Sequence, residues 1–393
     1  VFAVLFALAL TKIGAEGRRQ VVGVVRRDRR QGQEAVTVRA PSLNSVAPRS
    51  PARHARPMAA LEIHRFGPDD TDDVRVSFEI TTAVAAADAP WEHPWLPSRF
   101  DSFLRLGWDG EPPVCYLASI DGRPVGSAFV FYSERDNTHL GWTWLAILPD
   151  RRRQGYGSAL FEHVVAEIRT AGRTSVGTDG WESERALGFA ARHGLERKSQ
   201  AIMRRQHLTD FAPGRLQELY DEVAAAAKEY ELVRVVGRTP EHMVEAMVEL
   251  VSAINDAPTD DLDIEDEVFS PERLAAYEEA AMARGSRLYR LVARHKDTGE
   301  LGGHTVIAVE DERPEIGDQH DTAVAKAHRG HRLGLFLKVA MLLWLAEAEP
   351  DTAAPPRSIR RRPWPASMRP AAATTSALLV RSLTSFAISS ACP

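Results

Sequence analysis

A run of arginines and glycines, RRRQGYGSAL at 151–160, joins an apolar, strand-like segment at 138–148 to a segment with helical periodicity at 158–171. The first amides of a helix lack partners within the helix, and the helix dipole adds partial positive charge at that end. Glycine lets the backbone approach a ligand without an intervening Cβ atom. We therefore expect this turn to bind an anion such as a phosphate group.

Two well-known phosphate-binding turns do not match this one. A P-loop requires GxxxxGK[ST], whereas this turn has no lysine and a different spacing. The dinucleotide fingerprint GxGxxG is met at Gly155 and Gly157, but its third place holds Leu160. Asp179 stands at the sequence distance of a ribose contact, yet the antiparallel strands expected before the turn do not suit that fold.

A third pattern fits better. The run IxPxxRRQGYG at 147–157 resembles the R-x-x-G-x-G acyl-CoA signature of the GCN5-related N-acetyltransferase (GNAT) superfamily. The elements expected around it follow the order of that family: strands at 61–66, 114–120, 125–132, 138–148, 174–179 and 195–206, and helices at 71–88, 158–171 and 183–194. The hairpin at 114–132 has an Asp-Gly turn.

The resemblance implies an α/β fold with a mixed, mostly antiparallel sheet flanked by helices, and acetyl-CoA as co-substrate without a metal. It implies that the backbone of Ile147 and Leu148 pairs with the pantetheine arm, that the amides of 153–158 cradle the pyrophosphate, and that Arg152 is the signature basic residue. The implied cofactor-binding residues are Ile147, Leu148, Arg152, Arg153, Gln154, Gly155, Tyr156, Gly157 and Ser158.

The catalytic groups are less clearly marked. Many members of the family carry a tyrosine near the CoA sulfur as general acid, and here Ala190 occupies that place. Glu134 and His139 lie around the end of one strand and the start of the next, where the family often keeps a base; the alternative is that both are solvated loop charges. Trp142 and Trp144 share one strand face and are expected in the core or in the wall of the acceptor pocket.

A second copy of the signature follows the first. The run RGHRLG at 329–334 precedes an apolar helix, and Gly334 follows Gly157 by 177 residues. Arg332 replaces the first glycine, so the copy is imperfect. We expect two tandem GNAT domains, as in tandem actinobacterial acetyltransferases with mycothiol synthase-like architecture. The expected vestigial cofactor residues of the second are Arg329, Gly330, Arg332 and Gly334.

The expected boundaries follow from composition. Segment 1–57 is rich in Arg, Pro and Ser and is expected to be disordered or a non-native upstream extension. An N-terminal GNAT domain is expected at 58–208, a linker at 209–230, and a partial second domain at 231–350, with an acidic run at 256–267 that we interpret as a solvated loop. The tail 351–393 has no Glu or Lys and suggests a frameshift after Pro350.

Composition bounds the partners. Formal net charge is −5, but both ends are basic, so the acidic excess lies between them and argues against general affinity for nucleic acid. Two cysteines make no disulfide framework and no four-cysteine zinc site. The apolar residues 1–10 are too few to span a bilayer. We expect a cytoplasmic monomer or homodimer with a small-molecule amine acceptor and without nucleic-acid or membrane partners.

Two functions remain open. One is acetyl-CoA-dependent N-acetyl transfer to a primary amine by direct attack on the thioester. The other is a catalytically weak or inactive tandem module that binds acyl-CoA as a sensor or scaffold.

Overall fold

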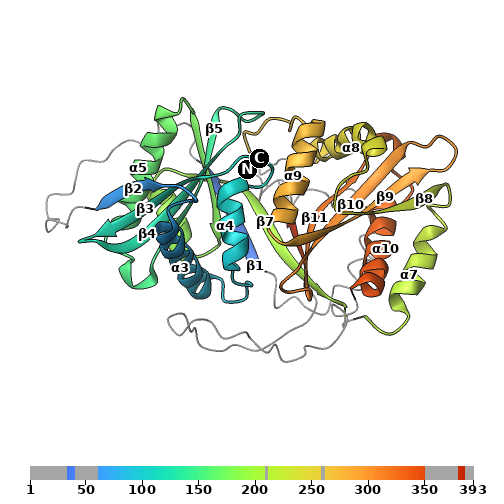
Figure 1. Cartoon of the computed structure of the whole chain (residues 1–393), viewed down its shortest axis with the longest axis horizontal. Coiled ribbons are helices and arrows are strands. Elements are labelled where there is room, and N and C mark those ends of the chain that lie inside the picture. The colour runs from blue at the N-terminus through green and yellow to red at the C-terminus, as the bar shows by residue number, and fades with distance from the viewer. Residues whose placement is uncertain (1–32, 40–60, 209–210, 258–261, 350–378, 386–393) are drawn as a thin grey trace, which may run out of the picture. The chain divides into compact units, whose positions relative to one another are not determined.

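The computed structural model describes residues 33–39, 61–208, 211–257, 262–349 and 379–385 (Figure 1). The chain divides into two compact units. Unit 1 comprises Val1–Met203, Asn255–Arg284 and Leu383–Pro393, and unit 2 comprises Arg204–Ile254 and Gly285–Ser382. The two expected domains are therefore not contiguous in sequence, because residues 255–284, expected in the second domain, belong to unit 1.

The sheet of unit 1 is mixed, as expected. From β2 to β5 the strands pair antiparallel, β5 pairs parallel with β6, and β1 lies antiparallel between β6 and β7. In spatial order the strands are β2 (Glu62–Phe66), β3 (Val114–Ile120), β4 (Arg123–Tyr132), β5 (Leu140–Ile147), β6 (Ser175–Trp181), β1 (Gln33–Arg39) and β7 (Glu196–His207).

Strand β1 lies within segment 1–57, where disorder was expected. Its sequence QEAVTVR contains β-branched residues that favour strands, and backbone pairing with both β6 and β7 supplies the order that composition alone does not indicate. The predictions for 1–32 and 40–57 lie outside the described residues.

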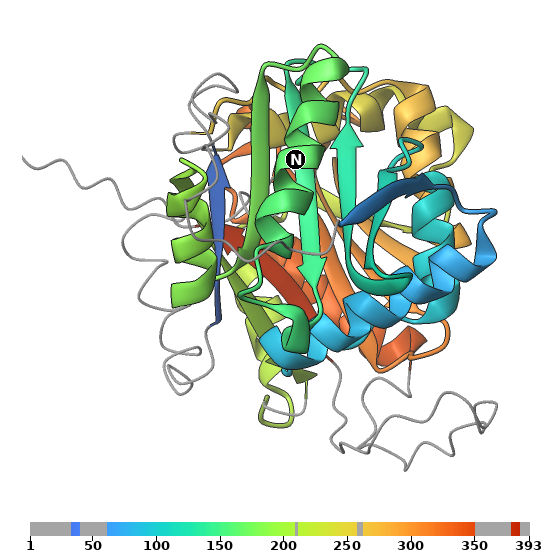
Figure 2. The ribbon, with the colours of Figure 1, turned by 90° about the vertical axis from the view of Figure 1, so that its left-hand side faces the viewer.

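Helices cover both faces of the unit 1 sheet. Because successive side chains of a strand point to opposite faces, each face of the sheet has its own hydrophobic core. Tyr116 and Ala118 face α5 (Tyr156–Thr170) and α6 (Glu184–Arg192). Cys115 and Leu117 face α3 (Thr71–Asp88) and α4 (Pro97–Leu106). Figure 2 shows α5 lying across its face of the sheet. Helix α9 (Pro271–Ala283) packs against α4, where the Ser102 hydroxyl donates to the Ala283 carbonyl oxygen at 2.9 Å.

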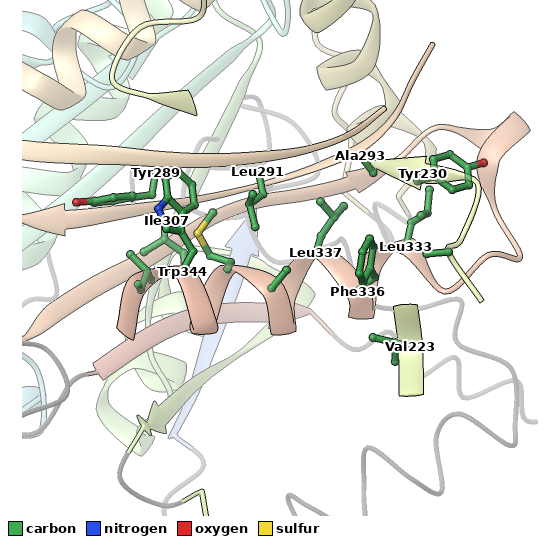
Figure 3. Close-up of a cluster of buried hydrophobic side chains, with 14 of the residues drawn as sticks. Val223, Tyr230, Tyr289, Leu291, Ala293, Ile307, Leu333, Phe336, Leu337 and Trp344 are labelled. Carbon is green, nitrogen blue, oxygen red and sulfur yellow. The ribbon is translucent and has the colours of Figure 1, made fainter. Parts of the chain in front are cut away.

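Unit 2 repeats the plan of a hairpin, a strand, a turn and an apolar helix. Its strands are, in spatial order, β12 (Leu379–Ser385), β11 (Ile316–Val324), β10 (Leu301–Glu310), β9 (Ser286–His295) and β8 (Tyr230–Val236). Its helices are α7 (Arg215–Ala224), α8 (Val244–Val251) and α10 (Leu333–Ala348). Side chains from β9 and β10 pack on α10 in a continuous core (Figure 3).

Two expectations for unit 2 need amendment. Helix α7 occupies residues 215–224 within the segment 209–230 that was expected to be a linker. Strand β12 lies in the tail expected to be irregular, and it pairs parallel with β11 from Ile316 opposite Leu379. The remaining expectations for 351–378 and 386–393 concern residues outside those described. Among the described helices, none is long and apolar enough to cross a membrane.

Candidate functional site

The parallel pair in unit 1 opens part-way along its length. Pairing of β5 with β6 runs from Leu140 opposite Ser175 to Thr143 opposite Thr178, and in the described part of the chain it ends there. Residues 144–147 continue β5, held on the other edge by β4. The diverging strands leave backbone groups of β5 free to pair with an extended ligand.

The free edge differs in one detail from the expected cofactor contacts. The Leu148 amide donates to the Val125 carbonyl oxygen of β4 at 3.0 Å, so it faces away from the opening. Ile147 and Leu145 alternate with it and face the open edge. The Ile147 carbonyl oxygen accepts from Arg152 Nε at 3.0 Å, which leaves the Ile147 amide and the backbone of Leu145 for a ligand.

The turn after β5 has the backbone shape of an anion-binding concavity. A short 3-10 helix, η2 (Pro149–Arg151), is followed by Arg153 at φ 62° and Gly155 at φ 90°, both left-handed. Helix α5 then begins at Tyr156. The amides of 153–158 have no backbone acceptor among the described residues, as expected for successive N–H groups at a helix start.

The side chain of Arg152 points away from the turn and bonds to other parts of unit 1. Its two terminal nitrogens donate to the Oδ1 and Oδ2 atoms of Asp88, the last residue of α3, at 2.7 and 2.8 Å. Together with the Ile147 carbonyl, these bonds commit Nε and both terminal nitrogens to the protein. The structure thus makes Arg152 a positioning residue of the turn, whereas Arg153 and Gln154 are exposed.

We expect Arg152→Lys to lower the free energy of unfolding of unit 1 by about 1–3 kcal/mol, because one ammonium cannot replace a two-pronged carboxylate contact and a carbonyl contact together. Urea unfolding measures the change. Arg151→Lys is the matched control, since Arg151 is paired with its neighbour Asp150 at 3.5 Å on the surface. Equal stability of the two variants would contradict the assignment.

A carboxylate that sequence reasoning did not assign to this site stands at the opening. Asp179, next after the last paired residue of β6, accepts the indole N–H groups of both Trp142 and Trp144 on its Oδ1 atom, each at 2.7 Å. The Trp142 ring lies over Gly177, where an added Cβ would come within 2.3 Å of it. The sequence does contain a signal for this contact. Trp142 and Trp144 are two residues apart on one strand, and Gly177 and Asp179 have the same spacing on the next strand.

Comparison with known proteins agrees with this geometry. Residues 80–195, which include the opening and the turn, match the model of the acetyltransferase (GNAT) family. Unit 1 contains a GNAT domain. A tandem GNAT protein from the clavulanic acid biosynthesis pathway matches with a TM-score of 0.63 at 23% identity, over 83% of this chain and 90% of that one.

A GCN5-related N-acetyltransferase from Sphaerobacter thermophilus matches with a TM-score of 0.53 at 14% identity, over 85% of this chain and 89% of that one. Both likenesses extend over unit 2 and show that the chain has the fold of a tandem GNAT protein. No protein with a curated description matches the sequence significantly.

The structure does not bring Glu134 and His139 to the opening of the GNAT domain. Glu134 is ion-paired with Arg173, and His139 Nε2 lies 3.1 Å from the Asp263 carbonyl oxygen. Both belong to the loop before β5, and the strand opens only after Thr143, about 10 Å further along at about 3.3 Å per residue. Their contacts favour the alternative of loop charges, which here fix the loop and a distant segment.

Ala190 offers no hydroxyl in the place where the family often has a tyrosine. Ala190 is buried in the core beneath α5. Ser183 caps α6 by accepting the Ala186 amide at 3.1 Å. His193, at the C-terminal end of α6, lies with Nε2 3.0 Å from Ser158 Oγ in the first turn of α5. Sequence reasoning missed this contact, which joins the two helices beside the turn.

The corresponding turn of unit 2 repeats the backbone but carries an ion-paired arginine. Arg329 Nε donates to the Val324 carbonyl oxygen at 3.2 Å, as Arg152 does to Ile147. Left-handed residues again occur in alternation, but Arg332 at φ 54° stands where the GNAT domain has a glycine. Its guanidinium nitrogens lie 3.3 and 3.4 Å from Oε1 of Glu222 on α7. The expected vestigial site therefore carries an ion pair of its own.

Proposed function

We propose that unit 1 is an acetyl-CoA-dependent N-acetyltransferase that acetylates a primary amine of a small-molecule acceptor. The observation that carries this proposal is the opening of β5 from β6 after Thr143 and Thr178, followed directly by a turn with unpartnered amides. An extended chain ending in a pyrophosphate matches both features: the strand edge pairs with amide groups of the arm, and the turn accepts the phosphates. Membership of residues 80–195 in the GNAT family supports the same chemistry.

The chemistry requires little of the protein beyond placement. The neutral amine attacks the thioester carbonyl carbon, the C–S bond breaks, and the amine proton leaves to a base or to water. A backbone N–H of the open β5 edge can stabilise negative charge on the carbonyl oxygen. Because Ala190 provides no acid, the thiolate takes its proton from water. Holding two substrates in reacting geometry supplies a large part of the rate.

The second candidate is a non-catalytic acyl-CoA-binding module. Ala190, in place of the usual tyrosine, is the observation that favours it. Both candidates predict acetyl-CoA binding, and only the first predicts release of free thiol on adding an amine. A thiol-release assay across a panel of primary amines therefore separates them.

We expect the full-length chain to bind one acetyl-CoA, in unit 1. In unit 2, Arg332 stands where unit 1 has Gly155, so that turn bears a side chain, ion-paired with Glu222, in place of a glycine that lets a ligand approach the backbone. Isothermal titration calorimetry gives the stoichiometry directly. Two equivalent sites per chain would contradict the assignment of unit 2, and no binding by the folded chain would overturn the proposed function.

A further inference from the structure

The sheet face opposite α5 carries aromatic side chains that lead to Asp179. The rings of Phe131 and Trp144 lie 4.7 Å apart, and Phe103 is stacked on Trp144 at 6.1 Å. Trp142 is buried beside them, whereas Trp144 and Asp179 are partly exposed. This face therefore offers an apolar aromatic surface with one carboxylate at its margin.

The Asp179 carboxylate is rigidly held and only half satisfied. Its Oδ1 atom accepts two indole N–H groups, while its Oδ2 atom has no hydrogen-bond partner among the described residues. The indoles fix the orientation of the carboxylate without neutralising its charge. A fixed carboxylate beside aromatic faces suits an ammonium group, because both the charge and the ring quadrupoles attract a cation.

A segment from far along the chain covers this face. Residues 262–267, termed here the covering segment, place Leu262 and Ile264 against Trp142 and Trp144. Asn137 holds the segment through three hydrogen bonds with Glu265. The Asn137 backbone amide donates to Glu265 Oε2 and the Glu265 backbone amide donates to Asn137 Oδ1, each at 2.8 Å, and Asn137 Nδ2 donates to the Glu265 carbonyl oxygen at 3.5 Å. These residues were expected in the second domain, and they form an apolar wall in unit 1.

We propose that Asp179, Trp144 and the covering segment form the acceptor subsite of unit 1, and that it takes a primary alkylamine. The ammonium pairs with the free Oδ2 atom of Asp179, and the alkyl chain lies on Trp144 and Ile264. This inference rests on the proposed function and names the class of acceptor. Asp179 lies where β5 and β6 part, so a bound amine is next to the strand edge that would carry the thioester.

The position also accounts for the protons of the reaction. The bound ammonium first loses one proton to water and becomes a nucleophile, and the attacking nitrogen loses a second proton as the N–C bond forms and the C–S bond breaks. The Asp179 carboxylate accepts this second proton and passes it through water to the departing CoA thiolate. The products are the N-alkylacetamide and free CoA thiol, and no oxidant, reductant or further reactant is needed.

The test is calorimetric titration of hexylamine into the full-length chain with CoA present, for the wild type and for Asp179→Asn. The asparagine oxygen can still accept both indole N–H groups, so the variant removes the charge and keeps the local packing. We expect hexylamine affinity to fall about tenfold or more, with acetyl-CoA affinity unchanged. Glu162→Gln, on the exposed side of α5, is the matched charge control.

The outcomes separate this inference from the function on which it rests. Wild-type hexylamine affinity in Asp179→Asn, or no saturable hexylamine binding by the wild type, overturns the subsite. If the folded wild-type chain does not bind acetyl-CoA, the proposed function itself is overturned. In a thiol-release assay, Asp179→Asn should also raise the KM for hexylamine or lower kcat, whereas Glu162→Gln should do neither.

A second variant tests the covering segment. Ile264→Ala removes apolar surface from the proposed alkyl subsite, so hexylamine affinity should fall several-fold and ethylamine affinity should not change. The proposed placement puts the longer chain of hexylamine, and not the ethyl group of ethylamine, against this wall. An equal change for both amines, or a change for neither, contradicts the placement of the alkyl chain.

Discussion

Replacing Gly157 by glutamate is expected to abolish acetyl-CoA binding by the full-length chain. Gly157 lies in the first turn of α5, next to the unpartnered amides. An ideal Cβ there meets a side-chain carbon of Ile147 at 3.5 Å and one of Phe189 at 3.6 Å, which are ordinary contacts, so a Cβ atom fits without displacing its neighbours. The carboxylate would lie beside the proposed pyrophosphate site. Two like charges at about 4 Å repel by about 4 kcal/mol at an effective dielectric constant of about 20, roughly a thousandfold in affinity.

Calorimetry on the variant and on Ala166→Glu checks this expectation. Ala166 is exposed on the same helix, away from its first turn, so the control carries the same new charge without facing the turn. Retained binding in the control with loss in Gly157→Glu places the phosphates at 153–158. If Gly157→Glu binds acetyl-CoA as the wild type does, the ligand lies elsewhere.

The turn could be predicted from sequence because its determinants are local. A glycine at a left-handed position, a strand that ends before Pro149 and an apolar helix that follows are all visible within one stretch of chain. The order of strands and helices in unit 1 was predicted for the same reason, except for α4 and β1, and the mixed α/β fold is confirmed. Strand β1 escaped prediction because its order comes from pairing with β6 and β7, which are distant in sequence.

The groups around the turn could not be predicted, since their partners are far away in the sequence. Arg152 looks like a phosphate ligand in the motif, and only the structure shows Asp88, 64 residues earlier, holding it. Asp179 has no motif of its own and gains its place from two indoles on the next strand.

The covering segment shows the same limit at the level of domains. Its acidic residues read as a solvated loop when taken alone, and the repeated signature suggested a contiguous second domain. Instead Glu265 bonds to Asn137, 128 residues earlier, and its neighbours pack on Trp142. A domain boundary inferred from an internal repeat assumes that each domain is one continuous stretch of chain. Here residues 255–284 follow the start of unit 2 in sequence but belong to unit 1.

Arg273→Met is expected to destabilise unit 1 by about 3–5 kcal/mol, because it leaves buried carboxylates without their cation. The Arg273 side chain is 3% exposed. It donates to Asp109 Oδ2 at 2.8 Å, to Asp136 Oδ2 at 2.6 Å and to Glu267 Oε2 at 3.0 Å. Urea unfolding of the full-length chain, followed by tryptophan fluorescence, measures the loss.

The charge of Arg273 stays in place over the whole working pH range. Burial by itself would lower the pKa of Arg273, but the negative charges of Glu267, Asp109 and Asp136 outweigh burial and raise the pKa above the ordinary value of an arginine. A cation with a raised folded pKa contributes stability at every pH below its unfolded pKa and loses it only above its folded pKa. The contribution of Arg273 itself should therefore be the same at about pH 7 and about pH 10.

The control is Arg75→Met, which removes an arginine that is 45% exposed and paired with Asp72 and Glu79 on the surface of α3. Its cost should stay below about 1 kcal/mol. The difference between the two variants measures how far unit 1 depends on residues 255–284. On the same argument, a fragment ending at residue 208 retains Asp109 and Asp136 without Arg273 and should be markedly less stable than unit 1 in the full chain. A fragment as stable as the whole unit would show that α9 and the covering segment only rest on a domain that is complete without them.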